Sequence, residues 1–381
     1  LVPYVRGVFN LNYTQAMMVQ FSFFSAYFLF SIPLGLLVNR IGYQQGIVLG
    51  LLTTAVGCVM FLPAAEMLSY PVFLMALFVI AIGVCCLQVS ANPYVTVMGS
   101  EASAASRLNL TQGFNSLGTV VAPFIAAFFI FSTFSELTPN VKDVQLPYLI
   151  IALLLVLLAL FFIRSNLPVV RYSSENQLTA NTESVNLRGM LIVLNTQRHL
   201  MYGALGIFFY VGVEVSIGSL LVSFIADPTI GNMPEASASQ YVAFFWAGAM
   251  MGRFVGFYLM QYIAPNVLLT VITILASGLI LLATFTSGKL AMWSILSIGL
   301  CHSIMFPTIF SLAIARLGIA SPHGSGILCL AIVGGAVIPI FQALVADTLG
   351  LQLSLLLTLV SYTYIAFFAI YGHKPTVNSL E

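Results

Sequence analysis

Long apolar runs separated by short polar connections dominate the chain. Eleven runs approach or exceed the roughly 20 apolar residues that a membrane-crossing helix requires. They cover residues 15–38, 43–62, 71–98, 106–134, 146–164, 198–226, 237–262, 266–286, 289–318, 321–349 and 352–372. A membrane barrel would instead show alternating segments of about ten residues. The pattern therefore predicts an all-α integral membrane protein.

One connection, residues 165–197, is much longer and more polar than the others. It separates five apolar runs from six. We therefore predict an N-terminal bundle at 1–164, a cytoplasmic linker at 165–197 and a C-terminal bundle at 198–381.

The distribution of positive charge predicts which side of the membrane each connection faces, because cytoplasmic connections are enriched in Lys and Arg. With the linker in the cytoplasm, nine basic residues lie at cytoplasmic helix ends and three at outer ends. The nine are Arg40, Arg107, Arg164, Arg171, Arg188, Arg198, Arg253, Arg316 and Lys374. This topology places the C-terminus in the cytoplasm. Five runs before the linker and six after it lead us to expect one further helix before Leu1.

Composition agrees with a membrane protein and argues against other classes. Hydrophobic residues make up 60% of the chain and charged residues only 6%, whereas soluble domains are about 25% charged. The net charge of +1 gives no basis for a nucleic-acid partner. Nucleotide-binding and hydrolase motifs are absent from fitting contexts. We expect neither an enzyme nor a cofactor, so an ion gradient would have to drive any accumulation.

Glu214 is the only acid well inside a predicted span, in the sequence YVGVEVSIGS. An ionised, unpaired carboxylate at that depth costs several kcal/mol, so it must be neutral, paired or hydrated. A group of this kind suits ion coupling, although a purely structural hydrogen bond is the alternative. Tyr210 lies one helical turn before it on the same face. It would line the same cavity or serve as a helix-interface residue.

Two further helices carry amides in otherwise apolar sequence. Gln88 and Asn92 are four residues apart, next to Pro93, which removes a backbone donor. Gln112 and Asn115 belong to a polar stripe along the next run. Each amide both donates and accepts hydrogen bonds, which suits sugar hydroxyls. Hydrogen bonding between neighbouring helices is the alternative interpretation.

Three other polar residues are candidates of lower rank. Asn109 extends the stripe of the fourth run, and His302 lies alone in the ninth. A membrane histidine relays protons or forms an interface hydrogen bond. Arg253 lies near a cytoplasmic helix end, where it would pair with helix C-termini or nearby acids, or anchor at lipid headgroups.

The segments ANPYVTVMG, RLNLTQGFNSLG and FPTIFSLAI resemble the fucose permease and glucose/galactose permease branch of the major facilitator superfamily. The likeness extends over nearly the whole chain. It implies two six-helix bundles that work by alternating access. The eleven runs would then be helices two to twelve, and helix one would be missing from this chain.

Two differences from fucose permease refine this resemblance. Gln88 stands where fucose permease has a Glu, and Glu214 stands where it has Gln. The EVSIGS stretch resembles the glucose/galactose permeases instead. The resemblance therefore allows sodium coupling, with a sodium site near Glu214, beside proton coupling.

These observations combine into one prediction of function. We expect a monomeric hexose–cation symporter of a bacterial inner membrane, with glucose or galactose as the sugar and sodium or a proton as the ion. The sugar-binding candidates are Gln88, Asn92, Gln112, Asn115, Tyr210 and Glu214, with Glu214 also coupling the cation. The alternatives are an N-acetylglucosamine or fucose symporter and a sugar sensor that does not transport.

Overall fold

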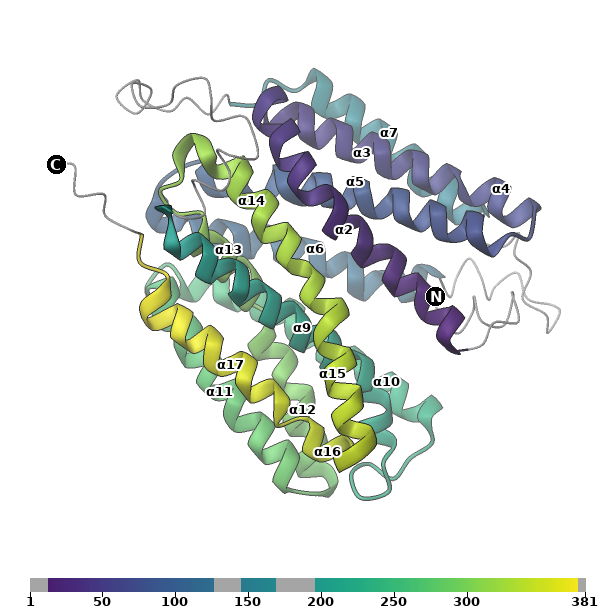
Figure 1. The fold of residues 1–381 in the computed structure, drawn as a ribbon, viewed down its shortest axis with the longest axis vertical. Coiled ribbons are helices and arrows are strands. Elements are labelled where there is room, and N and C mark those ends of the chain that lie inside the picture. Colours follow the sequence, from purple (N-terminus) through teal and green to yellow (C-terminus); the bar gives the residue numbers. More distant parts are fainter. Residues whose placement is uncertain (1–12, 127–144, 169–195, 376–381) are drawn as a thin grey trace. The chain divides into compact units, whose positions relative to one another are not determined.

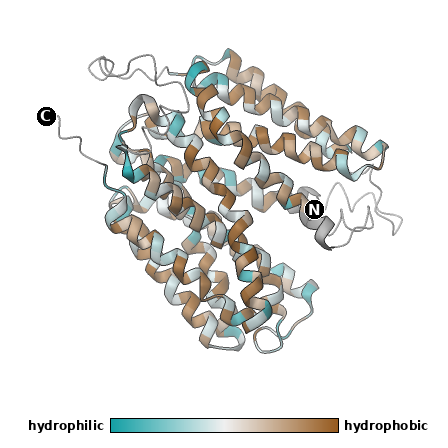
Figure 2. Ribbon diagram, viewed as in Figure 1, coloured by the Kyte–Doolittle hydropathy of each residue, from teal (hydrophilic) through white to brown (hydrophobic). Residues whose placement is uncertain are grey.

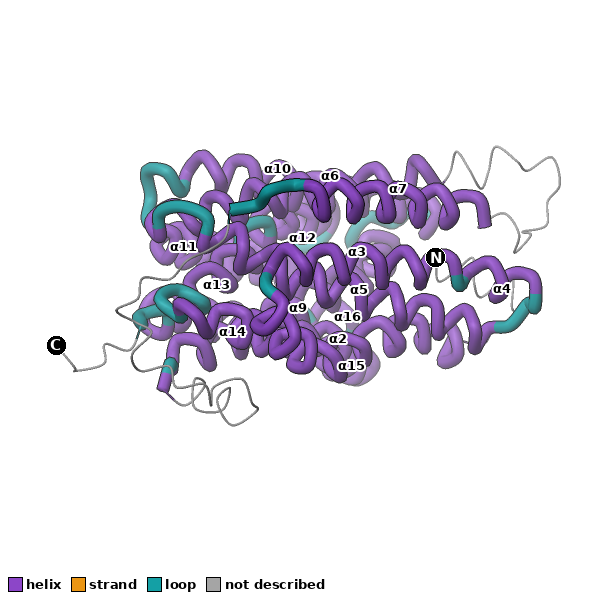
Figure 3. Tube along the Cα trace, turned by 90° about the horizontal axis from the view of Figure 1, so that it is seen from above, coloured by secondary structure: helices purple, strands orange, loops and turns teal. Residues whose placement is uncertain are grey.

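The computed structural model describes residues 13–126, 145–168 and 196–375. Within these ranges every regular element is a helix and there is no strand (Figures 1 and 3). Ten helical segments in the described residues, some made of two or three consecutive helices, are long and apolar enough to cross a membrane. The all-α prediction is confirmed.

Ten of the predicted runs match these spans. The eleventh, predicted at 106–134, is helix α6 (Ala104–Ala126), and residues 127–134 lie outside the described residues. Helix α6 is not among the ten spans because polar residues interrupt its apolar sequence. These polar residues are the stripe that the sequence singled out.

The described residues group into two compact units, and each is considered by itself. Of the described residues, the first unit comprises 13–94, 121–126, 145–168 and 319–330, and the second 95–120, 196–318 and 331–375. Helix α6 therefore belongs mostly to the second unit, although it precedes the linker in sequence. Most of the linker lies outside the described residues, so the predicted division into bundles at 165–197 stays a prediction.

The first unit is built largely from helices of the N-terminal part of the chain. They are α2 (Tyr13–Ile41), α3 (Tyr43–Val59), α4 (Phe61–Glu66), most of α5 (Tyr70–Val97), α7 (Gln145–Arg164) and α14 (Ser321–Leu330). Helix α14 packs along α2 although about 280 residues separate them in sequence (Figure 1).

The second unit holds the first part of α6 and most of the C-terminal helices. The others are α9 (Arg198–Ala226), α10 (Glu235–Leu259), α11 (Pro265–Phe285), α12 (Gly288–His302), α13 (Met305–Ala313), α15 (Gly334–Leu349), α16 (Leu351–Ser354) and α17 (Leu357–Phe367). Short 3₁₀ turns η1 (Glu101–Ser103), η6 (Gly318–Ala320) and η7 (Ala331–Val333) and a π-helical turn η8 (Phe368–Gly372) complete the described elements.

Apolar side chains cover the outside of the helices as well as their contacts. Figure 2 shows hydrophobic residues along the helices and hydrophilic residues gathered mainly near their ends. Helix α7 is the clearest case, because only Ala152 and Ala159 on it are buried while Leu153 and Phe161 are more than half exposed. Such a surface needs lipid as its solvent.

Glycine allows the closest helix contacts of the second unit. A Cβ atom at Gly299 on α12 would lie 2.1 Å from the carbonyl oxygen of Phe245 on α10. A Cβ atom at Gly334 on α15 would lie 2.0 Å from the carbonyl oxygen of Phe208 on α9. Small residues at such crossings let backbones approach and pack tightly, as is typical between membrane helices.

Candidate transport site

The second unit contains a helix break that organises its polar residues. Helix α12 ends at His302 and α13 begins at Met305. Pro307 has no backbone N–H, so it cannot donate the helical hydrogen bond to the carbonyl of Ser303 four residues earlier. The break therefore offers backbone carbonyls to side chains of neighbouring helices.

Tyr210 and Glu214 lie on α9, and Tyr210 contacts this break. The Tyr210 hydroxyl lies 2.8 Å from Glu214 Oε1 and 3.0 Å from the carbonyl oxygen of His302, and it donates to both. Tyr210 is buried, with 1% of its surface exposed. The spacing of four residues places both side chains on one face of the helix. The predicted juxtaposition of Tyr210 and Glu214 is confirmed.

His302 continues this polar cluster towards α17. Its Nε2 lies 2.7 Å from the hydroxyl of Tyr362, and both residues are fully buried. The rings of Tyr210 and Phe245 approach that of His302 edge-on, at 5.6 and 5.8 Å between centroids. We call Tyr210, Glu214, His302 and Tyr362 the carboxylate cluster.

Arg253 on α10 binds the next backbone carbonyl of the break. Its Nε donates to the carbonyl oxygen of Ser303 at 3.0 Å. Its Nη1 donates to the carbonyl oxygen of Gln112 at 3.1 Å and also to the Ser116 hydroxyl. Ser303 is the C-terminal cap of α12. Of the two predictions for Arg253, pairing with a helix C-terminus is confirmed.

The polar stripe of α6 includes Gln112, whose carbonyl oxygen Arg253 binds. Asn115 is exposed, and its Nδ2 donates to Gln112 Oε1 at 3.1 Å. Asn109, one turn before Gln112, is fully buried and donates to the Ala105 carbonyl at 2.9 Å and to Thr308 Oγ1 at 3.4 Å. Asn109 therefore joins α6 to α13, as a helix-contact residue does.

Gln88 and Asn92 lie in the first unit, on α5, with Pro93 inside the same helix. Asn92 is buried, whereas Gln88 is half-buried. The Oε1 atom of Gln88 has no hydrogen-bond partner in the described part of the chain. An amide oxygen left in this way has hydrogen-bonding capacity for a bound solute.

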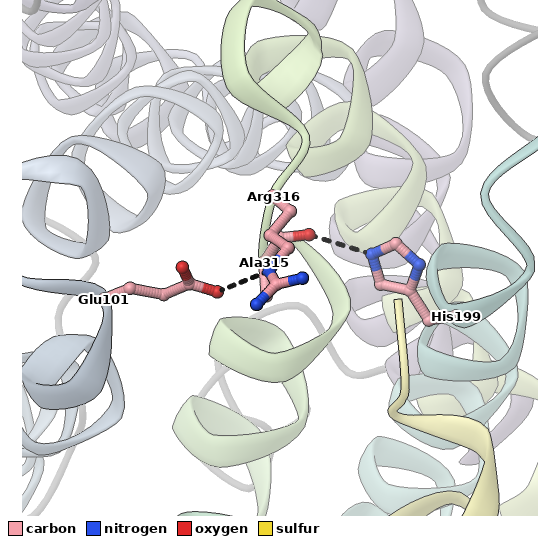
Figure 4. A network of polar contacts seen from close by, with 4 residues as sticks. All are labelled: Glu101, His199, Ala315 and Arg316. Atoms are coloured by element: carbon pink, nitrogen blue, oxygen red, sulfur yellow. Dashed lines mark hydrogen bonds and ion pairs between the residues drawn. The ribbon is translucent and has the colours of Figure 1, made fainter. Parts of the chain in front are cut away.

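Another polar network of the second unit involves η1 and the end of α13 (Figure 4). Arg316 forms an ion pair with Glu101 at 3.5 Å, and both side chains are more than half exposed. Beside it, His199 Nε2 lies 2.9 Å from the carbonyl oxygen of Ala315. Exposed pairs of this kind contribute about 0–1 kcal/mol, so this one adds little stability.

The described residues offer no ready-made metal cage. No group of three His, Cys, Asp or Glu side chains in residues 13–126, 145–168 and 196–375 is placed to hold a metal ion. Glu214 with the Tyr210 hydroxyl supplies oxygen atoms, which are the ligands that hard cations prefer.

Comparison with known proteins identifies the family. The sequence model described as the Major Facilitator Superfamily matches residues 1–326. The chain belongs to this superfamily. It is therefore a multi-pass membrane transporter, and the predicted fold and branch are confirmed.

Relatives cover almost the whole of this major facilitator chain. The glucose/galactose transporter of Brucella abortus is 49% identical over 98% of this chain and 89% of its own length. A putative glucose/galactose transporter of Helicobacter pylori is 41% identical over 100% and 93%. The L-fucose–proton symporter of Escherichia coli is 31% identical over 99% and 89%.

The solved structures agree with this assignment. A crystal structure of a single-substitution variant of the E. coli fucose:proton symporter matches with a TM-score of 0.88 at 30% identity. The match covers 97% of this chain and 93% of the symporter.

The structure thus gathers some predicted residues of this transporter and adds others. Glu214, Tyr210 and His302 form one cluster, and Gln112 with Asn115 a neighbouring pair. Sequence reasoning missed Tyr362 and gave Ser116 no partner. Tyr362 lies among other aromatics in SYTYIAFF, where nothing distinguishes it in sequence.

Proposed function

We propose that this major facilitator transporter takes up a hexose of the glucose/galactose type together with a cation, by alternating access. The identity of 49% to a glucose/galactose transporter over 98% of the chain is the observation that carries this proposal. The L-fucose–proton symporters among the relatives support cation coupling as the driving force. It is a sugar:cation symporter, with sodium or a proton as the ion.

Glu214 is the proposed coupling group. A carboxylate in a membrane span is costly unless it is protonated or paired. Binding of a cation to Glu214 removes that cost, and so favours whichever conformation shields the carboxylate from water. A difference in ligand affinity between two conformations is the thermodynamic requirement for coupling.

The sugar contacts are proposed to come from amides and from the carboxylate cluster. Gln88 and Asn92 on α5, and Gln112 and Asn115 on α6, would exchange hydrogen bonds with hydroxyl groups. Glu214 would accept hydroxyl donors from α9. Transporters of this kind place solute near the bilayer midplane.

The charge distribution and the bacterial relatives support a proposal for the membrane and the orientation of the chain. We place the chain in a bacterial inner membrane as a monomer, with its C-terminus in the cytoplasm. The basic residues at predicted cytoplasmic helix ends, such as Arg164 at the end of α7, support this orientation.

A fucose–proton symporter is the second candidate. The match to the E. coli fucose:proton symporter at 30% identity and TM-score 0.88 favours it. Gln88 counts against it, because this residue cannot titrate at a position where the resemblance to fucose permease implies a Glu.

A competition assay separates these substrates. The purified full chain is reconstituted in liposomes loaded with unlabelled sugar, and exchange of labelled galactose is measured against glucose, L-fucose and N-acetylglucosamine. We expect glucose and galactose to compete best. Exchange that only L-fucose or N-acetylglucosamine supports would replace the hexose assignment.

A further inference from the structure

The helix break between α12 and α13 presents two successive carbonyls to two different side chains. The His302 carbonyl accepts from Tyr210, which also holds Glu214. The Ser303 carbonyl accepts from Arg253, which also holds α6. The two carbonyls belong to adjacent residues. They therefore link Glu214, the only acid well inside a membrane span of the described residues, to the contact between α10 and α6.

Arg253 contributes hydrogen bonds to the contact between α6 and α10, beside the edge-on packing of Phe114 on Phe254. Its guanidinium donates to the Gln112 carbonyl and to the Ser116 hydroxyl from one nitrogen, Nη1. The Ser106 hydroxyl adds one bond to the Phe257 carbonyl at 2.8 Å, one turn further along α10. Among these contacts only that of Arg253 carries charge, and charge-assisted hydrogen bonds are roughly twice as strong as neutral ones.

Arg253 and Glu214 approach the same break, Arg253 through the Ser303 carbonyl and Glu214 through the Tyr210 hydroxyl on the adjacent His302 carbonyl. No direct ion pair joins them in the described part of the chain, where Arg253 is bound to α6 and the break instead. The α6 contacts are thus the observed position of the guanidinium, and an ionised Glu214 at the same break would be a second partner of opposite charge.

We propose that Arg253 is a positioning residue that competes with the coupling cation for Glu214, and so links cation binding to the hold of α10 on α6. The inference rests on the proposed cation symport and names the residue that regulates the coupling group. When Glu214 is free and ionised, it attracts Arg253 away from Gln112 and Ser116. When a cation occupies Glu214, this attraction ends and Arg253 stays bound to α6.

Linkage makes the competition reciprocal. Whatever strengthens the hold of Arg253 on α6 tightens cation binding, and whatever weakens that hold loosens cation binding. Removing the guanidinium altogether abolishes the competitor, so cation binding tightens. The two kinds of substitution therefore act in opposite directions, although each one breaks the same contact with α6.

The test measures cation binding directly on the purified full chain in detergent. Sodium is titrated at fixed pH, and protons are titrated in sodium-free buffer, with the fluorescence of Trp246 and Trp293 as the readout. Trp246 lies beside Gly218 on α9, one turn from Glu214, so it is placed to respond. Circular dichroism and gel filtration establish that each variant is folded.

Three variants and one control are compared. We expect Arg253→Gln to bind the coupling cation about tenfold more tightly, which lies within the usual range of coupling between sites. Ser116→Ala and Arg253→Lys, which keep the charge but weaken its hold on α6, should bind it about threefold more weakly. Ser277→Ala should match the wild type, because that hydroxyl bonds only within α11.

Shifts in the same direction for Arg253→Gln and Ser116→Ala would overturn the inference, since a merely structural contact predicts that result. A wild-type protein that responds to neither sodium nor protons would overturn it as well. Opposite shifts in a protein that exchanges no hexose would support the role of Arg253 and refute the proposed sugar instead.

Discussion

The Tyr210 hydroxyl donates to both the carboxylate of Glu214 and the carbonyl of His302. One side chain therefore connects the proposed coupling acid to the break between α12 and α13. Because a hydroxyl has a single proton, a stronger bond to one acceptor weakens the bond to the other. A change in the charge of Glu214 is thus transmitted to the backbone of another helix.

Tyr210→Phe removes this connection while it keeps the ring that packs against His302. We expect cation-driven uptake to fall by about tenfold, equivalent to about 1.4 kcal/mol, with sugar exchange less affected. Uptake and exchange in proteoliposomes measure both quantities. The matched control is Tyr258→Phe, because Tyr258 is 58% exposed at the end of α10. Equal losses in uptake and exchange would contradict a specific role in coupling.

Glu214→Gln tests the coupling group itself. The amide keeps the size of the side chain and its capacity to accept from Tyr210, but it cannot ionise, so it neither carries a coupling proton nor offers sodium a negative charge. We expect concentrative uptake to be abolished while some sugar binding or exchange remains. Full accumulation by this variant would remove Glu214 from the coupling mechanism.

Gln88→Ala tests the amide of α5. Its buried Oε1 has no hydrogen-bond partner in the described residues, so the proposed role is to bond a sugar hydroxyl. We expect the affinity for sugar to fall by more than about tenfold, or roughly 1.4 kcal/mol. Gln261→Ala, at an exposed position beyond α10, is the matched control. Binding measured by isothermal calorimetry that is equal in both variants would exclude Gln88 from the site.

Gly299→Ala tests helix packing rather than transport. The added Cβ atom would lie 2.1 Å from the Phe245 carbonyl oxygen, so α10 and α12 must separate. We expect the free energy of unfolding to fall by about 1–3 kcal/mol, which is typical of overpacking. Thermal unfolding in detergent measures it against Gly278→Ala, where the new Cβ meets nothing within 4 Å. An unchanged midpoint at Gly299 would show that these helices tolerate a wider spacing.

Asp347→Asn should leave uptake nearly unchanged. Asp347 is exposed near the end of α15, so its carboxylate does not lie in a buried site. Substitutions at exposed positions usually alter stability by less than about 0.5 kcal/mol. An inactive variant with normal expression would instead place Asp347 within the transport path.

The sequence predicted the helices because apolar runs of membrane-spanning length leave few alternatives. It also predicted the Tyr210–Glu214 pair, since a spacing of four fixes a shared helix face. Tyr362 and Ser116 were not predictable in this way. Their roles depend on which helices pack together, and a local pattern carries no information on contacts between residues far apart in sequence, such as that of Ser116 with Arg253.

The α12–α13 break shows the same limit. Pro307 in sequence indicates a lost hydrogen bond but not which side chain replaces it. The structure assigns the Ser303 carbonyl to Arg253 and the His302 carbonyl to Tyr210.

Gradient-driven uptake of labelled glucose and galactose into proteoliposomes tests the central claim most directly. The full chain is reconstituted, and inward gradients of sodium and of protons are imposed separately. Hexose symport predicts accumulation above equilibrium with one of these gradients and its collapse when an ionophore dissipates that gradient. Uptake of both sugars that only equilibrates under either gradient, or no uptake of either sugar by folded protein, would contradict it.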